Sequence, residues 1–219
     1  PRITFQRSYG FINSDLTVGV DITRSKELKA TANIAHDGVK LHGSGFILTE
    51  LQAQRLGLGT LPGLEKHVRP YRNGRDFTAR CRNLLVADLF GLSDTEVRSR
   101  FPALYQHLLD RVRYDKDEFG VPRVDGKGRR TGREWNNRAA YKENWWIFGE
   151  PRRELRPALD GLDRFIATVD TARHRIFQFV PAGFILDDKL VVIARDDAAD
   201  LAVLSSRIHV VWSLRAGGW

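Results

Sequence analysis

The chain has 219 residues and a mass of 25.0 kDa, a length that fits one large domain or two small ones. Apolar residues make up 42% and charged residues 28%, which excludes disorder as the main state. No apolar run approaches the roughly 20 residues of a bilayer-spanning helix, so no membrane partner is expected. The chain opens without a secretory signal, and its single cysteine, Cys81, indicates a reducing compartment; we therefore expect a cytoplasmic protein.

The net charge of +8 is concentrated in two short stretches. Residues 69–82 hold five arginines and one aspartate, and residues 121–140 hold six cations and two acids, so each stretch carries +4. Localised positive charge is the footprint of a polyanion binder and indicates a nucleic-acid partner. Basic loops on an ordinary soluble surface remain the alternative.

The first third of the chain predicts strands and one short helix. Alternating apolar and polar residues favour a half-buried strand over 16–22, and a second strand is expected over 39–48, with two glycines that permit a bend. Thr49 is expected to cap a helix that ends at Leu56 before a pair of glycines. The apolar run 84–89 favours a buried strand.

The middle third predicts helices. Ser93 followed by a glutamate three residues later is typical of a helix start, and Pro102 is expected to kink or restart that helix. Residues 115–132 contain four glycines and predict a basic, mobile loop. A strand or aromatic anchor is expected over 144–148, and a short helix over 151–159.

The last third of the chain again predicts strands. Strands are expected over 164–169, 175–180 and 190–194, with 170–174 as the turn between the first two. An amphipathic helix is expected over 198–214. Its apolar face comprises Leu201, Leu204, Ile208, Val211 and Trp212. Strands at both ends with helices between them predict an α+β fold: one mixed domain over 1–219, with twisted, mainly antiparallel sheet segments and packed helices.

Motifs for catalysis are missing from the chain. None of the eight prolines are adjacent, so the polar-Pro-Pro-aromatic motif of amino-group DNA methylation is absent, as are glycine-rich cofactor and phosphate loops. No His and Cys residues have metal-ligand spacing, so no metal site is expected. Asp21 with Glu27 and Lys29 is similar to the cluster of magnesium-dependent nucleases, and a solvated strand edge is the alternative.

Residues 69–76 are the most specific candidate for DNA contact. Asn73 and Gly74 predict a tight turn around which arginines project, and arginine can grip a phosphate or guanine in bidentate fashion. Asn73 could pair with adenine or stabilise the turn, and an ordinary ion pair between Arg75 and Asp76 is the alternative. The candidates here are Arg69, Tyr71, Arg72, Asn73 and Arg75.

Three further segments combine cations with amides, aromatics or a turn. Aromatic side chains beside arginine can stack on bases, although tryptophan is more often core; we expect Trp146 in the core and leave Trp145 open. Two arginines near the expected helix start at 151 fit an adjacent phosphate. The candidates are Asn136, Asn137, Arg138, Arg152, Arg153, Arg173, His174 and Arg175, the last three at a hairpin tip.

Four blocks of residues, taken in their order along the chain, resemble a known protein family. They are NIA with GVKLHGSGF (33–46), RPYRNGRD (69–76), WW with PRR (145–153) and LSSRIHVVW (204–212). Together they resemble the C-terminal target-recognition region of class I S-adenosylmethionine-dependent N6-adenine DNA methyltransferases. These are the single-chain type IIG restriction–modification enzymes, MmeI-like or Eco57I-like.

The resemblance implies a division of labour. An upstream catalytic domain of the same polypeptide would bind S-adenosylmethionine and receive the flipped adenine, while this region clamps double-stranded DNA and reads its sequence. The catalytic motifs lie outside these residues, so we expect no catalytic residue and no cofactor in this chain. The family pattern leaves residues 115–132 without a matching motif.

We therefore predict a sequence-specific DNA-binding domain of a larger bacterial methyltransferase or restriction–modification enzyme. The two basic stretches would contact phosphates, and the turns at 71–75, 136–138 and 173–175 would reach base edges from one concave wall. A self-contained magnesium-dependent nuclease and a protein-interaction module are the two alternatives.

Overall fold

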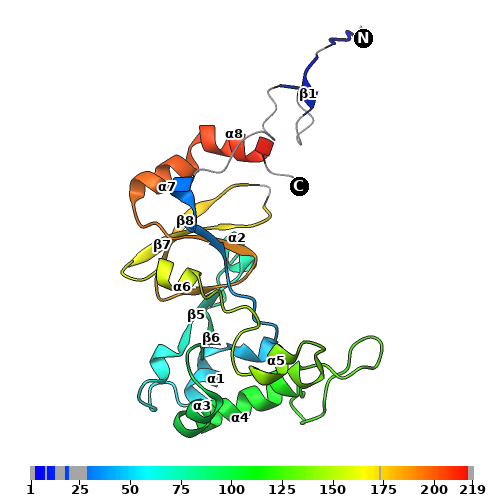
Figure 1. The fold of residues 1–219 in the computed structure, drawn as a ribbon, viewed down its shortest axis with the longest axis vertical. Coiled ribbons are helices and arrows are strands. Elements are labelled where there is room, and N and C mark those ends of the chain that lie inside the picture. Colours follow the sequence, from blue (N-terminus) through cyan, green and yellow to red (C-terminus); the bar gives the residue numbers. More distant parts are fainter. Residues whose placement is uncertain (1–2, 8, 13–17, 20–28, 173, 217–219) are drawn as a thin grey trace.

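The computed structural model describes residues 3–7, 9–12, 18–19, 29–172 and 174–216. Most of them build two four-stranded, mainly antiparallel sheets with short helices around them, which confirms the predicted α+β class (Figure 1). Near the N-terminus, β1 (Phe11–Ile12) pairs antiparallel with β2 (Val18–Gly19). The strand expected over 16–22 lies largely outside the described residues.

The first sheet has the order β3-β10-β7-β8, and every pair in it is antiparallel. Its strands are β3 (Ala35–Asp37), β7 (Arg164–Val169), β8 (Phe177–Pro181) and β10 (Leu190–Ile193). Phe165, Val180 and Val192 pack with Leu155 of helix α6 (Leu155–Ala158) in the first core. The three strands predicted in the last third are confirmed, with shifts of one or two residues at their ends.

The second sheet has the order β4-β6-β5-β9, and β9 pairs with β5 in parallel. Its strands are β4 (Ile47–Leu48), β5 (Val68–Arg72), β6 (Leu84–Ala87) and β9 (Ile185–Leu186). Phe46, Val86 and Leu104 are fully buried in the larger second core. Because β9 lies between β8 and β10 in the chain, the sequence crosses from the first sheet to the second and back.

Three short helices around the second sheet begin with a capping box, in which a side chain and a backbone amide three residues apart satisfy each other. Thr49 caps α1 (Glu50–Arg55) and Ser93 caps α3 (Asp94–Arg100), as predicted. Pro102 begins α4 (Pro102–Leu108), confirming the restart. The other helical segments are α2 (Gly74–Thr78), α5 (Ala139–Glu143), the 3-10 turns η2 (Lys29–Thr31), η3 (Ser44–Phe46), η4 (Leu64–Lys66) and η6 (Arg133–Trp135), and the π-helical turn η5 (Leu109–Arg113).

Two predicted elements are corrected, and a third is decided between its alternatives. Over 39–48, only Ile47–Leu48 is a strand, because the chain turns through η3 before it. Residues 144–148, expected as a strand or an aromatic anchor, form turns that anchor aromatic side chains. Trp145, which was left open, is buried, and Trp146, which was expected in the core, is half-buried against it. The helix expected over 151–159 is only the four-residue α6.

The predicted closing helix is two helices, α7 (Ala198–Ser205) and α8 (Arg207–Ala216). Ser206 is extended between them, and its hydroxyl accepts a hydrogen bond from the His209 amide, so a new helix starts with a different face inward. The His209 ring packs against Phe177, and Ile208 is 85% exposed. The prediction of one buried face through Ile208 and Trp212 is therefore wrong.

None of the helices in the described part of the chain is long and apolar enough to cross a membrane.

Candidate nucleic-acid interface

The predicted turn at 69–75 is a strand followed by a helix. Asn73 caps α2, its carboxamide oxygen accepting from the amides of Arg75 and Asp76, so its role is to stabilise the helix start. The Asp76 carboxylate accepts from Arg82 at 2.9 Å, in place of the expected Arg75–Asp76 pair. These hydrogen bonds from Arg82 lower the pKa of Asp76.

Tyr71 is a core residue rather than a surface candidate. Its side chain is 2% exposed, and its hydroxyl donates to the Asp187 carboxylate at 2.6 Å. Burial raises the pKa of both groups, and the hydrogen bond between them further raises that of Tyr71. The prediction that Tyr71 contacts DNA is corrected, because its side chain packs in the second core.

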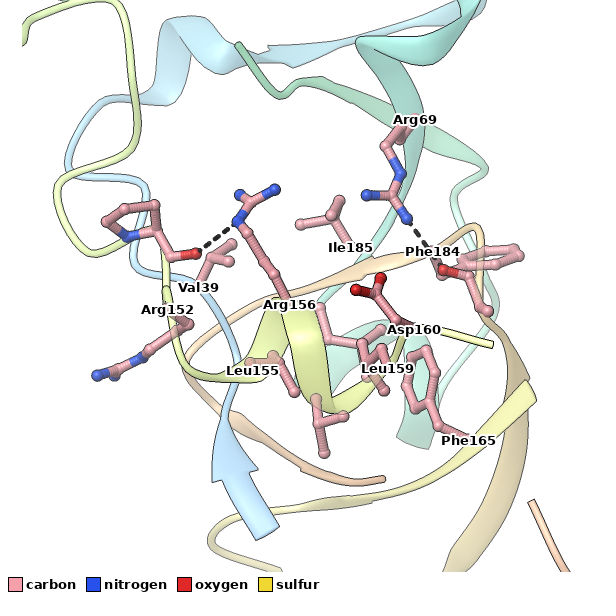
Figure 2. A pocket seen from close by; sticks show the side chains of 14 residues that line it. Val39, Arg69, Arg152, Leu155, Arg156, Leu159, Asp160, Phe165, Phe184 and Ile185 are labelled. Atoms are coloured by element: carbon pink, nitrogen blue, oxygen red, sulfur yellow. Dashed lines mark hydrogen bonds between the residues drawn. The ribbon is translucent and has the colours of Figure 1, made fainter. Parts of the chain in front are cut away.

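Arg69 and Arg152 line a cavity of about 250 Å³ between the two sheets (Figure 2). Arg69 donates to the carbonyls of Ala182 and Gly183 at 2.9 and 3.1 Å, and burial lowers the pKa of its guanidinium. Arg152 donates to the Gly38 carbonyl and lies 3.0 Å from the Glu150 carboxylate. Both side chains are held by the chain itself, which indicates a structural role.

Arg156, which the sequence analysis did not select, organises the same cavity (Figure 2). Its guanidinium binds Asp88 with two hydrogen bonds of 2.9 Å and stacks on Phe90 at 4.3 Å. The Asp88 carboxylate is buried and also lies 3.7 Å from Arg69. The charge pattern of the sequence gives no signal for this network, because Asp88 and Arg156 lie 68 residues apart in the chain.

Among the arginines of these segments, Arg75, Arg80 and Arg153 stay at the surface, whereas Arg72 is half-buried. Arg75 and Arg80 are exposed, and their side chains have no hydrogen bond or ion pair among the described residues. Arg72 lies over the Phe184 ring at 4.6 Å, with a buried, unpartnered Nε. Arg153 is exposed, 5.7 Å from the Phe90 ring, and the helix it precedes is too short to have the expected dipole.

The second basic stretch contains a buried cation. Arg133 is 3% exposed and donates to five backbone carbonyls, and no carboxylate pairs with it among the described residues. Burial lowers the pKa of its guanidinium to about 10. The carbonyls belong to Leu41, His42, Asn144, Trp145 and Ile147. Arg133 therefore joins two distant segments of the second core rather than facing solvent.

The neighbouring amides and arginine behave differently. Asn137 and Arg138 are exposed, and Arg138 donates to the Tyr141 hydroxyl at 3.0 Å. The Asn136 carboxamide accepts from the Arg138 amide, so its acceptor is engaged within the loop. Asn137 and Arg138 are thus the members of this group that a ligand can reach.

The loop over 115–132 folds into consecutive tight turns. Asp117 accepts from the amides of Phe119 and Val121, and Asp125 accepts from those of Lys127 and Arg129. Isolated bridges connect Lys116 with Pro122 and Val124 with Arg130. Exposed cations remain on this framework. They are Arg123 and Lys127, without side-chain partners in the described part of the chain, and Arg130, stacked on Trp135 at 4.9 Å.

The hairpin between β7 and β8 carries the last candidates. Arg173 lies outside the described residues, and His174 is exposed. Arg175 donates to the Asp170 carbonyl at 3.1 Å, and its Nε is buried without a partner. The tip is thus partly held by its own backbone.

The three predicted contact segments are distributed along the molecule. In Figure 1, α5, which follows residues 136–138, lies in the lower half, the β7–β8 hairpin lies in the upper half, and β5 with α2 lies between them. Arg69 and Arg152 line one cavity and Asn136 lines another. The expectation of a single shared wall is therefore wrong, and the candidate residues are spread along the long axis.

Two residues of the nuclease candidate, Asp21 and Glu27, lie outside the described residues, and Lys29 is exposed in η2. Within the described ranges, no group of three or more His, Cys, Asp or Glu side chains is placed to hold a metal ion.

This chain is similar to a known protein in its fold but not in its sequence. No family model matches the chain, and no curated protein matches it. The fold is one that a restriction–modification enzyme contains: 94% of this chain superposes on a solved structure with a TM-score of 0.56 at 17% identity. That structure is the type IIL restriction-modification enzyme MmeI in complex with DNA, and this chain spans 25% of its length.

Proposed function

We propose that this chain is the target-recognition region of an S-adenosylmethionine-dependent N6-adenine DNA methyltransferase or restriction–modification enzyme, and that it reads double-stranded DNA in a sequence-specific manner. The observation that carries the proposal is the fold likeness to MmeI, which was solved with DNA and which matches over 94% of this chain. The exposed cations of the two basic stretches support it independently.

Affinity would come from the free cations. Arg75, Arg80, Arg123 and Lys127 have no side-chain partner in the described part of the chain, so a phosphate would not compete with an internal ion pair. Asn137, Arg138 and His174 are exposed polar groups that could reach base edges. Phosphate contacts would set the register of the duplex, and these side chains would supply discrimination.

Catalysis would belong to another part of the polypeptide. The comparison structure is about four times as long as the aligned region, which leaves room for a catalytic domain that binds S-adenosylmethionine and receives the flipped adenine. The chain by itself is expected to bind DNA, to leave it unmethylated and uncleaved, and to show no heat of S-adenosylmethionine binding in calorimetry.

Salt dependence tests the DNA-binding part of this proposal. Fluorescence anisotropy with a labelled duplex should give an affinity that falls as salt rises, with a slope of about −0.9 for each phosphate contacted. A reduced-charge variant, Arg75→Gln with Arg80→Gln, should have a shallower slope. An affinity that is undetectable, or indifferent to salt, would support the interaction-module alternative instead.

Sequence specificity needs its own measurement. Repeated selection from a pool of duplexes with randomised sequence should enrich one recurring motif. Arg138→Ala should relax the preference at one position of that motif and cost about 1–3 kcal/mol on the preferred site. A pool that stays random after selection would contradict the target-recognition role and leave a general DNA binder.

The nuclease alternative is tested by incubating the chain with plasmid DNA and magnesium. Cleavage that disappears in Glu27→Ala and persists in Glu65→Ala, an exposed acid on η4, would establish the nuclease. Intact DNA in all three samples is the result expected from the proposed function.

A further inference from the structure

We infer that a polar groove beneath the loop 115–132 binds one phosphodiester of the DNA backbone between Arg111 and Arg123; this rests on the proposed function and assigns it a specific contact. Two pockets of about 200 Å³ each form the groove. Ser44, Arg111 and Asp115 line both pockets, so the two adjoin each other. Arg111 lies outside both basic stretches and was not a candidate from the sequence.

The backbone around the groove is irregular on both sides. The turn at 109–113 is π-helical, with the Tyr114 amide donating to the Leu109 carbonyl, and such turns are frequent at functional sites. Opposite it, η3 packs so closely that a Cβ on Gly45 would lie 2.5 Å from the Arg111 Cβ. The site therefore requires glycine at position 45 to bring the two segments together.

Two non-glycine residues with left-handed backbone also line the groove. His42 has φ of 48° and Asp115 has φ of 45°. This conformation is unfavourable for a residue with a side chain, and such strain concentrates at ligand sites. The rest of the fold holds these two residues in an unfavourable conformation, at the place where the polar side chains meet.

The charges favour an anion. Arg111, Lys116 and Arg123 line the first pocket together with one acid, Asp115. The Lys116 ammonium is already paired with the Asp110 carboxylate at 2.8 Å, so the two arginines supply the charge available to a ligand. Asp115 already accepts a hydrogen bond from the Thr131 hydroxyl at 2.6 Å. Arg123 is exposed and its side chain has no partner in the described part of the chain, while Arg111 uses one donor on the Lys116 carbonyl and keeps others for a ligand.

The two histidines of the groove add no positive charge to it. Burial lowers the pKa of His107, whose ring also bonds the Gly45 carbonyl. Burial and then the charges of Lys40 and Arg133 lower the pKa of His42. Both lowered pKa values favour the neutral ring, so neither histidine is counted as a cation of the groove.

The size and surroundings of the groove favour a backbone phosphate. Each pocket is smaller than the roughly 300–1,000 Å³ of a typical small-molecule site. On one side the loop continues to the free Lys127, and on the other the second pocket reaches Asn136, next to the exposed Asn137 and Arg138. A nucleic-acid strand that follows these groups would place one phosphate at Arg111 and its neighbours toward 127 and 138.

Duplex binding by three single variants, measured over a range of salt concentrations, tests this site. Arg111→Gln and Arg123→Gln should each weaken binding and reduce the magnitude of the salt slope by about 0.9, the loss of one phosphate contact. Arg98→Gln, on the exposed face of α3, is the matched control and should keep the wild-type slope. Arg111→Lys should keep the slope but bind more weakly, because lysine lacks the bidentate fork.

The outcomes separate the two proposals. Wild-type protein that binds DNA with a slope unchanged in both Arg111→Gln and Arg123→Gln would overturn the groove and leave the proposed function intact. Wild-type protein that binds no DNA would overturn the proposed function and the groove with it. Arg123 is exposed, and its side chain has no hydrogen-bond or ion-pair partner in the described part of the chain. Its variant therefore still tests the groove if the thermal unfolding of Arg111→Gln shows a folding defect.

Discussion

The two basic stretches carry the same net charge, yet they use it in different ways. In 69–82, three of the five arginines are engaged by the fold: Arg69 by carbonyls, Arg72 by an aromatic ring and Arg82 by Asp76. In 121–140, the loop exposes most of its cations, and one arginine, Arg133, is buried. The difference follows from local structure, because the residues of β5 are buried or half-buried beside the second core, whereas the loop of tight turns exposes its side chains.

The largest expected effect concerns the buried arginine. Arg133→Met leaves five backbone carbonyls without their donor, and we expect it to lower the free energy of unfolding by about 3–5 kcal/mol in urea titrations. Arg129→Met, an exposed ion pair in the same stretch, should change it by less than about 1 kcal/mol. Equal effects of the two variants would show that Arg133 is not the internal tie described above.

The next largest effect is that of the Asp76–Arg82 pair on the free energy of unfolding, and this effect depends on pH. The pKa of Asp76 is lowered in the folded state, so its contribution is present above the ordinary carboxyl pKa of about 3.9 and is lost as the pH falls through the lowered value. We expect Asp76→Asn to cost about 1–2 kcal/mol at neutral pH. The difference in the free energy of unfolding between wild type and variant should narrow below about pH 4. A difference that stays constant with pH would contradict a stabilising role for the Asp76–Arg82 pair.

Tyr71 provides a smaller effect that separates stability from DNA binding. Tyr71→Phe removes the hydrogen bond to Asp187 and should lower the free energy of unfolding by about 1 kcal/mol. Tyr105→Phe, which loses a longer hydrogen bond of 3.4 Å to Asp94, is the control and should cost less. The DNA affinity of folded Tyr71→Phe should equal that of wild type, and a weakened affinity would restore the original assignment.

The smallest effect on stability is expected for the free arginines of the first stretch. Arg80→Gln should change the free energy of unfolding by less than about 0.5 kcal/mol, because its side chain has no partner in the described part of the chain. It should nevertheless reduce the magnitude of the salt slope of DNA binding by about 0.9. An unchanged slope would exclude Arg80 from the phosphate contacts.

Local signals in the sequence predicted much of the fold. The caps at Thr49 and Ser93, the restart at Pro102 and the strand at 164–169 all depend on neighbouring residues, and the structure has them. The α+β class followed from their order along the chain.

The features that the sequence did not predict depend on distant contacts. Tyr71 was assigned to the surface because its partner strand β9, of two residues, lies more than 100 residues further along the chain. The burial of Arg133 depends on carbonyls at 41–42 and 144–147, and carbonyls carry no sequence signal. Ser206 is an exception, because its extended backbone and its hydroxyl, which caps the next helix, divide the last helix locally, and the apolar spacing does not encode that break.

The passage of the chain from β8 through β9 to β10 has a consequence for how this protein could be recombined. The second sheet needs residues 185–186 from the middle of the segment that builds the first sheet, so no single cut separates the two sheets into independent pieces. An exchange of one sheet between related proteins would need several crossover points, and the two halves should melt together in a single transition.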